Sequence, residues 1–383
     1  MISNKRPILV TAGGTGGHVY PGLAVARALI EQNIPIIWMG TRKGLEARVI
    51  PAAGIEMAWL DVNGLRGKGF MTIVIAPVQL LKALFQSIQI MRKYRPVAVL
   101  GMGGFVAGPG GLVASLMGIP VVIHEQNAVA GLTNKLLSRF SKRILEGFPN
   151  TFAKHISKAK QNKITAVGNP VRRDITGIAP PEQRLAMRKG ATRLLIIGGS
   201  LGAQALNEIV PQALALLDKS ERPVVRHQAG KGKEETTKAD YKALGVKATV
   251  TPFIEDMARA YEWADLIICR AGALTIAEVA AAGLASLLVP FPYAVDDHQT
   301  ANATYLSDKG AAILIQQTEF TKDLLSEVLQ SLLTDREKLL SMSVKARTLA
   351  KPSSTVDVAA ICAELAAYPF DKNFIKVNKG DVL

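Results

Sequence analysis

Residues 8–17 read ILVTAGGTGG, and residues 194–203 read LLIIGGSLGA. Each stretch places an apolar strand, two glycines, a hydroxyl residue and the start of a helix in the same order. A strand that runs into a glycine-rich turn and then a helix opens many nucleotide-binding α/β folds. Because this order occurs twice, we predict that the chain contains two copies of one such half and that the second copy begins near residue 193.

Short apolar runs alternate with helix-like segments along the rest of the chain, which is typical of βαβ units and a parallel sheet. Of all residues 49% are hydrophobic and only 5% are aromatic, as expected for aliphatic sheets buried beneath helices. A chain of 383 residues is too long for one ordinary core, so we predict two Rossmann-like α/β domains separated within the polar stretch 167–190. The predicted strands are 7–12, 34–39, 97–101, 120–124, 223–226, 248–251, 265–269 and 286–290, and the first predicted helix is 21–32.

The net charge of +15 is concentrated in the first half of the chain. Residues 1–170 contain 20 Lys/Arg and 6 Asp/Glu, whereas residues 171–383 contain 26 and 25. Between Asp61 and Glu125 no acidic residue occurs. A basic surface of this kind attracts phosphate-rich partners. Charge alone does not distinguish among nucleic acid, anionic lipid headgroups, a diphosphate substrate and a merely solvated surface.

Cysteine spacing and hydropathy argue against several classes of protein. Cys269 and Cys362 form no CxxC or Cys/His pattern that would hold a metal, and they suit a reducing cytosol. Residues 1–14 contain no apolar stretch long enough for a signal peptide, and no run in the chain reaches the ~18 residues of a spanning helix. We therefore expect a protein without a transmembrane segment.

Two polar segments of the first half follow predicted strands. In the loop 13–18, GGTGGH, backbone N–H groups and the positive end of the next helix can face an anionic or hydroxyl-rich ligand. Its spacing matches neither G-x-G-x-x-G nor a P-loop, which argues against a dinucleotide enzyme and an NTPase. His18 is placed to act as a general base, or it merely caps the turn. The cluster 124–127, HEQN, adds Glu125 as a second candidate base or as the partner that orients His18.

The second half contains three further candidates. The loop 198–200, GGS, offers a hydroxyl and backbone donors to a phosphate, a role that is compatible with Ser200 as a plain N-cap. Thr275 and Glu278 have the spacing of a capping box at a helix start. Alternatively, Glu278 accepts hydrogen bonds from both hydroxyls of a ribose. Arg172, which lies in the predicted inter-domain stretch, is either a diphosphate clamp or a solvated side chain.

The segment 70–93 differs from the loops because it combines apolar and basic residues. Residues 70–78 are almost wholly apolar, and apolar residues continue at helical spacing beside Lys82, Arg92 and Lys93. Most of this segment is expected to be core. An exposed subset would suit docking onto an anionic bilayer, because electrostatic attraction and apolar insertion add. The apolar residues considered for this role are Phe70, Met71, Ile73, Val74 and Ile75.

Nine motifs, in order from residue 7 to residue 303, resemble one bacterial enzyme family. These motifs are GGTGGHVYPGLAVA, GLRGKG, GMGGFVAGPGG, HEQNAVAGLTNK, GNPVR, GGSLGA, FIEDM, CRAGALTIAE and HQTANA. The family comprises the UDP-N-acetylglucosamine:undecaprenyl-diphospho-muramoylpentapeptide N-acetylglucosaminyltransferases, which convert lipid I to lipid II in peptidoglycan synthesis. The resemblance implies a GT-B fold, in which two Rossmann-like domains face a cleft. It further implies an acceptor- and membrane-associating domain, 1–168, joined by a C-terminal helix, 353–370, and a donor domain, 169–352.

The resemblance also assigns residues to the two substrates. At the junction of donor and acceptor it places Thr15, Gly16, Gly17, His18 and Asn127. For UDP-GlcNAc it implies that Arg172 and Ser200 hold the diphosphate, that the backbone of Ile254 reads the uracil and that Gln299 holds the sugar hydroxyls. Diphosphate and ribose would be covered by Ala273, Leu274, Thr275, Ile276, Ala277 and Glu278. His298 departs from the pattern, because some members have a second glutamine there.

The implied reaction is an inverting transfer of GlcNAc from UDP-GlcNAc to the 4-hydroxyl of lipid I. His18 is the first choice for the base and Glu125 the second, and helix N-termini, Ser200 and Arg172 would stabilise the leaving diphosphate. No metal or other cofactor is expected. The expected partners are the two substrates and the anionic cytoplasmic face of the bacterial cell membrane, where the enzyme would be peripheral, with no nucleic acid. The alternatives are another GT-B sugar-nucleotide enzyme, either a lipid glycosyltransferase or an epimerase, and a basic nucleic-acid-binding module.

Overall fold

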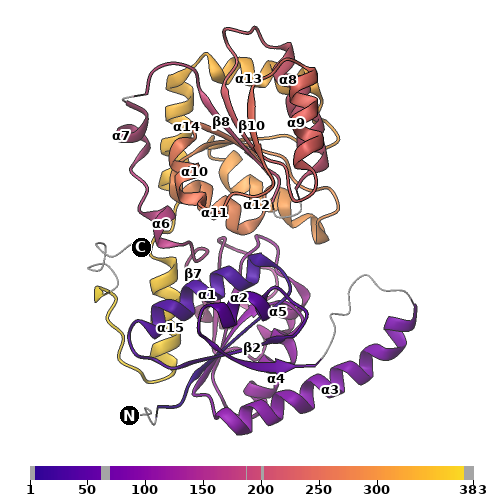
Figure 1. The fold of residues 1–383 in the computed structure, drawn as a ribbon. Helices are drawn as coiled ribbons and strands as arrows, with labels where there is room; N and C mark the ends of the chain where they lie inside the picture. The colour runs from indigo at the N-terminus through magenta and orange to yellow at the C-terminus, as the bar shows by residue number, and fades with distance from the viewer. Residues whose placement is uncertain (1–4, 62–69, 187, 200–201, 375–383) are drawn as a thin grey trace. The chain divides into compact units, whose positions relative to one another are not determined.

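The computed structural model describes residues 5–61, 70–186, 188–199 and 202–374. The chain divides into two units: in Figure 1 the first is coloured indigo to magenta, with the yellow C-terminal segment, and the second is coloured from magenta through orange. Unit 1 contains Met1–Pro170 together with Pro352–Leu383, and unit 2 contains Val171–Lys351. The last segment of the chain therefore belongs to the unit in which the chain begins.

Unit 1 contains a seven-stranded sheet. Within the described residues its strand order is β3-β2-β1-β4-β5-β6-β7, and every neighbouring pair is parallel. Strands β1, β4 and β5 are wholly buried, because apolar helices cover both faces of the sheet. The strands are β1 (Ile8–Ala12), β2 (Ile36–Thr41), β3 (Glu56–Leu60), β4 (Ala98–Gly103), β5 (Val121–Glu125), β6 (Arg143–Glu146) and β7 (Ile164–Ala166).

Successive side chains of a strand point to opposite faces of the sheet, so the core of unit 1 has one part on each face. In β1, Ile8 and Val10 join the cluster that contains α1 and α15, whereas Leu9 joins the cluster that contains α3, α4 and α5. Helix α15, from the C-terminal part of the chain, packs against α1. The helices are α1 (Gly16–Ile30), α2 (Glu46–Ala52), α3 (Phe70–Tyr94), α4 (Ala107–Leu116), α5 (Leu132–Leu137), η1 (Lys158–Lys163) and α15 (Ser354–Leu365).

Unit 2 contains a six-stranded sheet in the order β10-β9-β8-β11-β12-β13, and the neighbouring strands are again parallel among the residues described. Its strands are β8 (Arg193–Ile197), β9 (Val224–Gln228), β10 (Ala248–Thr251), β11 (Leu266–Cys269), β12 (Ala285–Leu288) and β13 (Ala312–Leu314). Its helices are α6 (Arg173–Thr176), α7 (Pro181–Ala186), α8 (Gln204–Leu216), α9 (Glu234–Ala243), α10 (Met257–Trp263), α11 (Ala273–Ala282), η2 (Val295–Asp297), α12 (His298–Ser307), α13 (Lys322–Leu333) and α14 (Arg336–Thr348).

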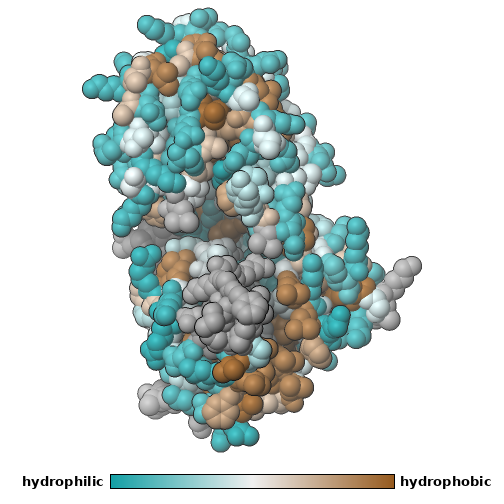
Figure 2. Space-filling model, turned by 90° about the vertical axis from the view of Figure 1, so that its right-hand side faces the viewer, coloured by the Kyte–Doolittle hydropathy of each residue, from teal (hydrophilic) through white to brown (hydrophobic). Residues whose placement is uncertain are grey.

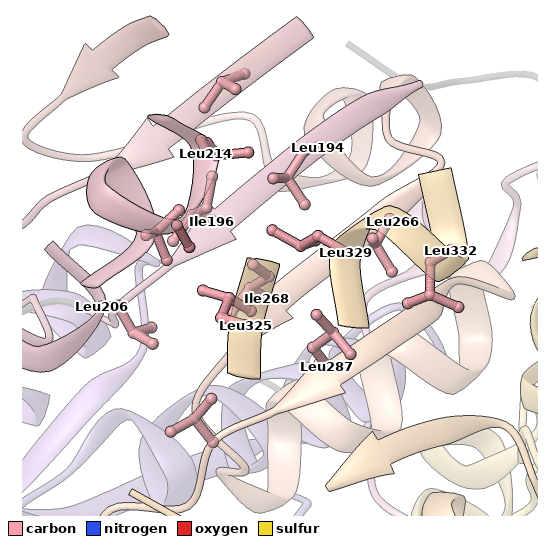
Figure 3. Close-up of a cluster of buried hydrophobic side chains, with 14 of the residues drawn as sticks. Leu194, Ile196, Leu206, Leu214, Leu266, Ile268, Leu287, Leu325, Leu329 and Leu332 are labelled. Carbon is pink, nitrogen blue, oxygen red and sulfur yellow. The ribbon is translucent and has the colours of Figure 1, made fainter. Parts of the chain in front are cut away.

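The core of unit 2 is formed by apolar helix side chains that pack against apolar side chains of the sheet. In α13, Leu325, Leu329 and Leu332 recur at spacings of four and three and form one buried stripe. Figure 3 shows this stripe against side chains from the sheet, among them Leu194 and Ile268. Both units are therefore α/β domains with parallel sheets, and this fold class confirms the prediction.

One predicted boundary is wrong in a way that concerns the first glycine loop. The sequence predicted the first helix over residues 21–32. In the structure, α1 already begins at Gly16, Thr15 is its N-cap, and Pro21 lies inside the helix. Gly16 and Gly17 therefore form the first turn of α1, where the N–H groups have no partner within the helix.

Candidate functional site

Each sheet has one point where the strand order reverses. In unit 1 this point lies between β1 and β4, and in unit 2 it lies between β8 and β11. Ligands of open parallel sheets bind outside the carboxyl ends of the strands at such a switch point. Within the described residues, the loops there are 13–15 and 104–106 in unit 1 and 198–199, 202–203 and 270–272 in unit 2. They define two candidate half-sites, one in each unit.

A buried carboxylate that the sequence analysis missed holds the loop after β1. Glu46, the first residue of α2, is fully buried. It accepts hydrogen bonds from the backbone N–H of Gly14 at 3.0 Å and from the N–H and hydroxyl of Thr41 at 3.0 and 2.8 Å. Three donors on one carboxylate fix the loop against β2. The available signal was a glutamate in 40–46, GTRKGLE, just after a predicted strand.

The imidazole of His18 reaches from α1 across the end of β4. A Cβ atom on Gly103, the last residue of β4, would lie 3.0 Å from Cε1 of His18. Gly103 also has a backbone φ of +101°, which residues other than glycine rarely adopt. Glycine at this position therefore leaves room for the half-buried ring to contact the loop that follows β5.

His18 contacts Gln126 within that loop. His18 Nδ1 lies 2.8 Å from Oε1 of Gln126, which is itself buried. The amide nitrogen of Gln126 lies 3.1 Å from Nδ1 of His124 and 3.3 Å from the backbone carbonyl of His124. On the far side of the His124 ring, Nε2 lies 2.9 Å from the backbone carbonyl of Gly168. Three side chains thus form a hydrogen-bonded row that ends on the backbone.

Glu125 does not occupy the position next to His18 that the sequence analysis considered for it. Its carboxylate is buried and accepts four hydrogen bonds from the segment that follows it, which comprises the loop after β5 and the start of α5. These come from the N–H and side-chain amide of Asn127 at 3.1 and 3.2 Å, the N–H of Gly131 at 3.0 Å and the amide of Asn134 at 2.9 Å. Gln126, and not Glu125, makes the hydrogen bond to His18. The expectation was wrong because adjacent residues leave a strand end in opposite directions.

Thr15 and Asn127 flank these groups. Thr15 is the N-cap residue of α1 and its carbonyl accepts hydrogen bonds from the N–H groups of His18 and Val19. Asn127 is half-buried, and its N–H and amide groups hold Glu125. The structure thus brings Thr15, Gly16, Gly17 and His18 together, with Gln126 as the contact between His18 and the loop that contains Asn127.

In unit 2, the loop after β8 is fixed from the neighbouring strand β9. Gln228, the last residue of β9, donates a hydrogen bond from its amide to the carbonyl of Gly199 at 3.0 Å. Ser200, predicted to contact phosphate, lies outside the described residues. Arg172 is the N-cap residue of α6 and is partly exposed, with Nε 4.0 Å from a carboxylate oxygen of Asp174. A pair with this geometry and exposure contributes little to stability.

The helix after β11 begins earlier than a capping box would require. Gly272 is the N-cap residue, so α11 begins at Ala273 and Thr275 is its third residue. Glu278 is the sixth residue of the helix and cannot serve as the N3 partner of a capping box, so that alternative is wrong. Ala273, Leu274 and Thr275 instead form the first turn, whose N–H groups face the loop.

The carboxyl group of Glu278 is held by a buried tyrosine from α10. The hydroxyl of Tyr261 donates a hydrogen bond to Oε2 of Glu278 at 2.9 Å. Part of the Glu278 side chain is exposed, yet its carboxyl is desolvated. This desolvation raises the pKa of Glu278 to about 6, against the charge of Arg172 and the hydrogen bond from Tyr261, both of which lower it. Glu278 therefore titrates close to neutral pH. Ile276 and Ala277 lie beside it in the helix, the first buried and the second half-buried.

Gln299, in the first turn of α12, connects the loops that follow β11 and β12. Its Oε1 accepts hydrogen bonds from the N–H of Ala271 at 3.2 Å and from the N–H of Phe291 at 3.0 Å. These two hydrogen bonds fix the oxygen and so set the orientation of the side-chain amide. Ile254 is half-buried in the loop between β10 and α10, and His298 is the first residue of α12.

Two family patterns match the chain, one for each half. The glycosyltransferase family 28 N-terminal domain matches residues 8–146, and the family 28 C-terminal domain matches residues 193–358. Together the matches include β1 to β6 of unit 1 and β8 to β13 of unit 2. The chain belongs to glycosyltransferase family 28.

Close relatives of this family 28 transferase cover almost its full length. It is 52% identical over 362 residues to the UDP-N-acetylglucosamine–N-acetylmuramyl-(pentapeptide) pyrophosphoryl-undecaprenol N-acetylglucosamine transferase of Dechloromonas aromatica, covering 94% of this chain and 99% of the relative. It is 50% identical to the enzyme of the same name from Marinobacter nauticus, over 95% and 99% of the two chains. The crystal structure of Acinetobacter baumannii MurG is 44% identical, with a TM-score of 0.81, over 94% and 99% of the two chains.

The family 28 transferase has a polar half-site in each unit. Among the residues described, no group of three or more His, Cys, Asp or Glu side chains is placed to hold a metal ion. The unit 1 half-site contains a histidine with an ordered partner, and the unit 2 half-site contains a helix N-terminus with a carboxylate in the following turn. The first arrangement suits proton transfer, and the second suits binding of a nucleoside diphosphate.

Proposed function

We propose that the family 28 transferase moves GlcNAc from UDP-GlcNAc to the 4-hydroxyl of lipid I, with inversion at the anomeric carbon, and so forms lipid II. The observation that carries this proposal is the identity of 52% and 50%, over nearly the whole chain, with transferases whose names state this sugar and this acceptor. The same relationship favours this transferase over an epimerase or a transferase of another lipid, the alternatives left open by the motifs.

The donor part of the proposal rests on α11. The N–H groups of Ala273, Leu274 and Thr275 lie at the positive end of this helix and suit the diphosphate. One turn further, the ionised carboxylate of Glu278 accepts hydrogen bonds from the two ribose hydroxyls. Ile276 and Ala277 complete the surface that covers the nucleotide.

Three other groups complete donor binding in this proposal. The amide NH₂ of Gln299 donates to the GlcNAc hydroxyls, since its oxygen already accepts from two backbone N–H groups. The backbone of Ile254 pairs with the uracil. Arg172 and Ser200 contact the diphosphate.

The chemical step requires one bond to form and one to break. The muramoyl 4-hydroxyl oxygen attacks the anomeric carbon of GlcNAc, and the bond from that carbon to the diphosphate oxygen breaks, so that UDP leaves with the electron pair. The His18 imidazole takes the hydroxyl proton, a role that a positioned histidine performs well near neutral pH. Glu125 is the weaker candidate for the base, because four hydrogen bonds from the following loop and from α5 occupy its carboxylate.

Replacing His18 by alanine tests the assignment of the base. We expect kcat for transfer to a lipid I analogue to fall by about 10²- to 10⁴-fold, the usual contribution of a general base. UDP-GlcNAc affinity measured by calorimetry should stay unchanged, because the contacts to the nucleotide belong to unit 2. Glu125→Gln serves as the comparison. An unchanged kcat in His18→Ala would remove His18 from the mechanism.

Calorimetric titrations test donor identity separately from the chemistry. We expect UDP-GlcNAc to bind more tightly than UDP-GalNAc, UDP-glucose or TDP-glucose. Gln299→Ala should reduce this preference for GlcNAc while UDP alone binds as before. Equal affinities of the unmodified protein for all four sugar nucleotides would contradict the donor assignment.

We also propose that the outer surface of α3 meets the anionic cytoplasmic face of the membrane, where the transferase is peripheral. Val78, Leu81 and Phe85 recur on one side of α3 and are exposed, Leu81 to 66% and Phe85 to 60%. Lys82 lies among them. The side chains of residues 70–76, for which the sequence analysis proposed the same role, lie outside the described part of the chain.

Exposed apolar residues of α4 and α5 extend this surface. Helices α3, α4 and α5 cover the same face of the unit 1 sheet, and Leu116, Leu132 and Leu136 point outward from the last two. Figure 2 shows hydrophobic side chains gathered on the lower part of the molecule in this view. Such apolar groups within a basic half of the chain suit an anionic bilayer, where burial and charge attraction add. No helix of the described residues is long and apolar enough to span a membrane.

Vesicle sedimentation tests this surface. We expect binding to vesicles that contain anionic phospholipid, weaker binding at high salt, and a loss of at least tenfold in Leu81→Glu/Phe85→Glu, with UDP-GlcNAc affinity unchanged. Leu216→Glu, at an exposed apolar residue of unit 2, is the matched control. Equal binding by both variants would refute the proposal, and so would salt-sensitive binding to RNA in place of vesicles.

A further inference from the structure

The hydrogen bonds of the row behind His18 have a fixed direction, because the backbone carbonyl at its far end can only accept a hydrogen bond. The backbone carbonyl of Gly168 lies 2.9 Å from Nε2 of His124 and has no proton to give, so His124 Nε2 must carry the hydrogen. In a neutral imidazole the other nitrogen then has a lone pair. Nδ1 of His124 is therefore an acceptor.

The same reasoning fixes the amide of Gln126. Its nitrogen faces two acceptors, Nδ1 of His124 at 3.1 Å and the carbonyl of His124 at 3.3 Å. Only the NH₂ end of an amide can satisfy both, so the oxygen must point toward His18. Oε1 of Gln126 lies 2.8 Å from Nδ1 of His18 and has only lone pairs to offer. Nδ1 of His18 must therefore carry the hydrogen.

The surroundings keep His124 neutral, as this direction requires. His124 and Gln126 are both buried. Burial lowers the pKa of His124 to about 4, against smaller opposite effects of the Gly168 carbonyl and of Glu125. His124 thus has a single ring hydrogen at neutral pH, and the hydrogen bond to Gly168 keeps it on Nε2.

We propose that Gln126, itself oriented by His124, is a positioning residue that holds His18 in the tautomer with hydrogen on Nδ1 and the basic lone pair on Nε2. The proposal deepens the proposed function and rests on it, since it states which nitrogen of the base accepts the proton. Proton transfer from the muramoyl hydroxyl then goes to Nε2 of His18. The imidazolium that forms keeps its Nδ1 hydrogen bond to Gln126 throughout.

The chemistry of the site also explains why the residue is glutamine. A carboxylate commonly orients a catalytic histidine, and loss of the correct tautomer in such a site reduces kcat by about 10⁴-fold. Here the orienting group must accept from His18 and donate to His124 at the same time. A glutamine amide does both, whereas an ionised glutamate would place a second acceptor against Nδ1 of His124.

The tautomer can be read directly in the free protein with ¹⁵N-labelled histidine. The chain has 5 histidines, so two-bond ¹H–¹⁵N spectra can be assigned by comparison with His18→Gln and His124→Gln. At pH 7.5 we expect hydrogen on Nδ1 for His18 and on Nε2 for His124. In Gln126→Met the His18 signal should change to mixed tautomers or to hydrogen on Nε2. Hydrogen on Nε2 of His18 in the unmodified protein would overturn the proposal.

Kinetic measurements add a readout that a merely structural role would not move. In Gln126→Met we expect kcat to fall at least tenfold with the KM for UDP-GlcNAc unchanged. In Gln126→Glu, the acid limb of kcat/KM should shift to higher pH, because the added carboxylate stabilises a positive charge on the adjacent imidazole. An unchanged kcat in Gln126→Met, together with an unshifted acid limb in Gln126→Glu, would refute the role of Gln126.

Gln32→Met is the matched control in the same unit. The Gln32 amide also makes two hydrogen bonds, both with the backbone of Asp371 and away from His18. This variant should keep the tautomer and the rate of the unmodified protein. If the unmodified protein fails to transfer GlcNAc, the proposed function fails, whereas the tautomer measurement in the free protein still decides the proposal about Gln126.

Discussion

At the scale of single residues, the half-sites depend on partners far away in the sequence. His18 is separated by 108 positions from Gln126, and Gly14 by 32 from Glu46. Tyr261 and Glu278 are separated by 17 positions and come from different helices. The motifs identified the residues proposed to contact substrate, but the sequence did not show which residues contact one another.

If Glu278 binds the ribose as proposed, its pKa makes donor binding depend on pH. With a pKa of about 6, the carboxyl is ionised above pH 6 and can accept hydrogen bonds from two hydroxyls, whereas below pH 6 it is protonated and loses one acceptor. We expect calorimetric affinity for UDP-GlcNAc to fall as the pH decreases from 7.5 to 5. UDP-GlcNAc is preferable to UDP here, because a terminal phosphate itself titrates near pH 6.

Tyr261→Phe sharpens this test. The hydroxyl of Tyr261 stabilises the ionised carboxylate, so its removal should raise the pKa of Glu278 and move the loss of affinity to higher pH. In Glu278→Gln the pH dependence should vanish and the affinity should be low throughout. An affinity that is independent of pH in the unmodified protein would argue against Glu278 as the ribose ligand.

At the scale of elements, helix ends decide where the half-sites lie. Helix α1 follows β1 in unit 1, and helix α11 follows β11 in unit 2. Each of these strands borders the switch point of its sheet. At its other end α11 stops at Gly283, whose φ is +61°. The buried guanidinium of Arg184 donates hydrogen bonds to the carbonyls of Ala282 and Gly283 at 2.6 Å each, and so satisfies two carbonyls at the helix end.

Gly283→Ala should destabilise unit 2. A Cβ atom at this position would lie 2.6 Å from Cγ of Pro181, in addition to the cost of about 1–2 kcal/mol for a left-handed residue that is not glycine. Gly245→Ala is the control, because Gly245 has a similar φ of +64° but no atom within 4 Å of its added Cβ. Urea unfolding should show a larger loss of unfolding free energy for Gly283→Ala. Equal losses would mean that Pro181 moves away without cost.

At the scale of the whole molecule, each unit contains one buried neutral histidine that acid must protonate. Burial lowers the pKa of His124 in unit 1 to about 4 and that of His227 in unit 2 to about 3. His227 lies between the hydroxyl of Tyr241 at 2.9 Å and the amide oxygen of Asn207 at 3.0 Å. Both units are therefore expected to lose stability over the same range of acidic pH.

Proton binding determines whether acid raises or lowers the stability. Between pH 6.5 and the lowered pKa, the unfolded histidine binds a proton that the folded one does not. The contribution of each buried histidine to the unfolding free energy is therefore fully present above pH 6.5 and is lost as the pH decreases. The full loss would be about 3 kcal/mol for His124 and about 5 kcal/mol for His227. We expect His227→Leu to flatten the pH dependence of thermal unfolding of unit 2 between pH 7 and 4. His155→Leu, at an exposed histidine of unit 1, should leave the pH dependence of both units unchanged.

The sequence by itself determined the fold class and the family, because both depend on local order. A strand, a glycine pair and a helix start follow one another within ten residues, and the occurrence of this order twice predicted two α/β halves. The repeat of the order at residue 194 predicted the second half. The sequence could not distinguish a helix start at Pro21 from one at Gly16, because the exact end of a helix is weakly determined by its residues.

The tertiary structure decided which side chains contact one another. The order of the unit 1 sheet places β4 between β1 and β5, so His18 reaches the loop after β5 only because Gly103 has no side chain at the end of β4. The alternating directions of neighbouring residues then present Gln126, and not Glu125, to the imidazole. Strand order and side-chain direction are properties of the assembled sheet, so the partner of His18 could not be determined before the sheet was known.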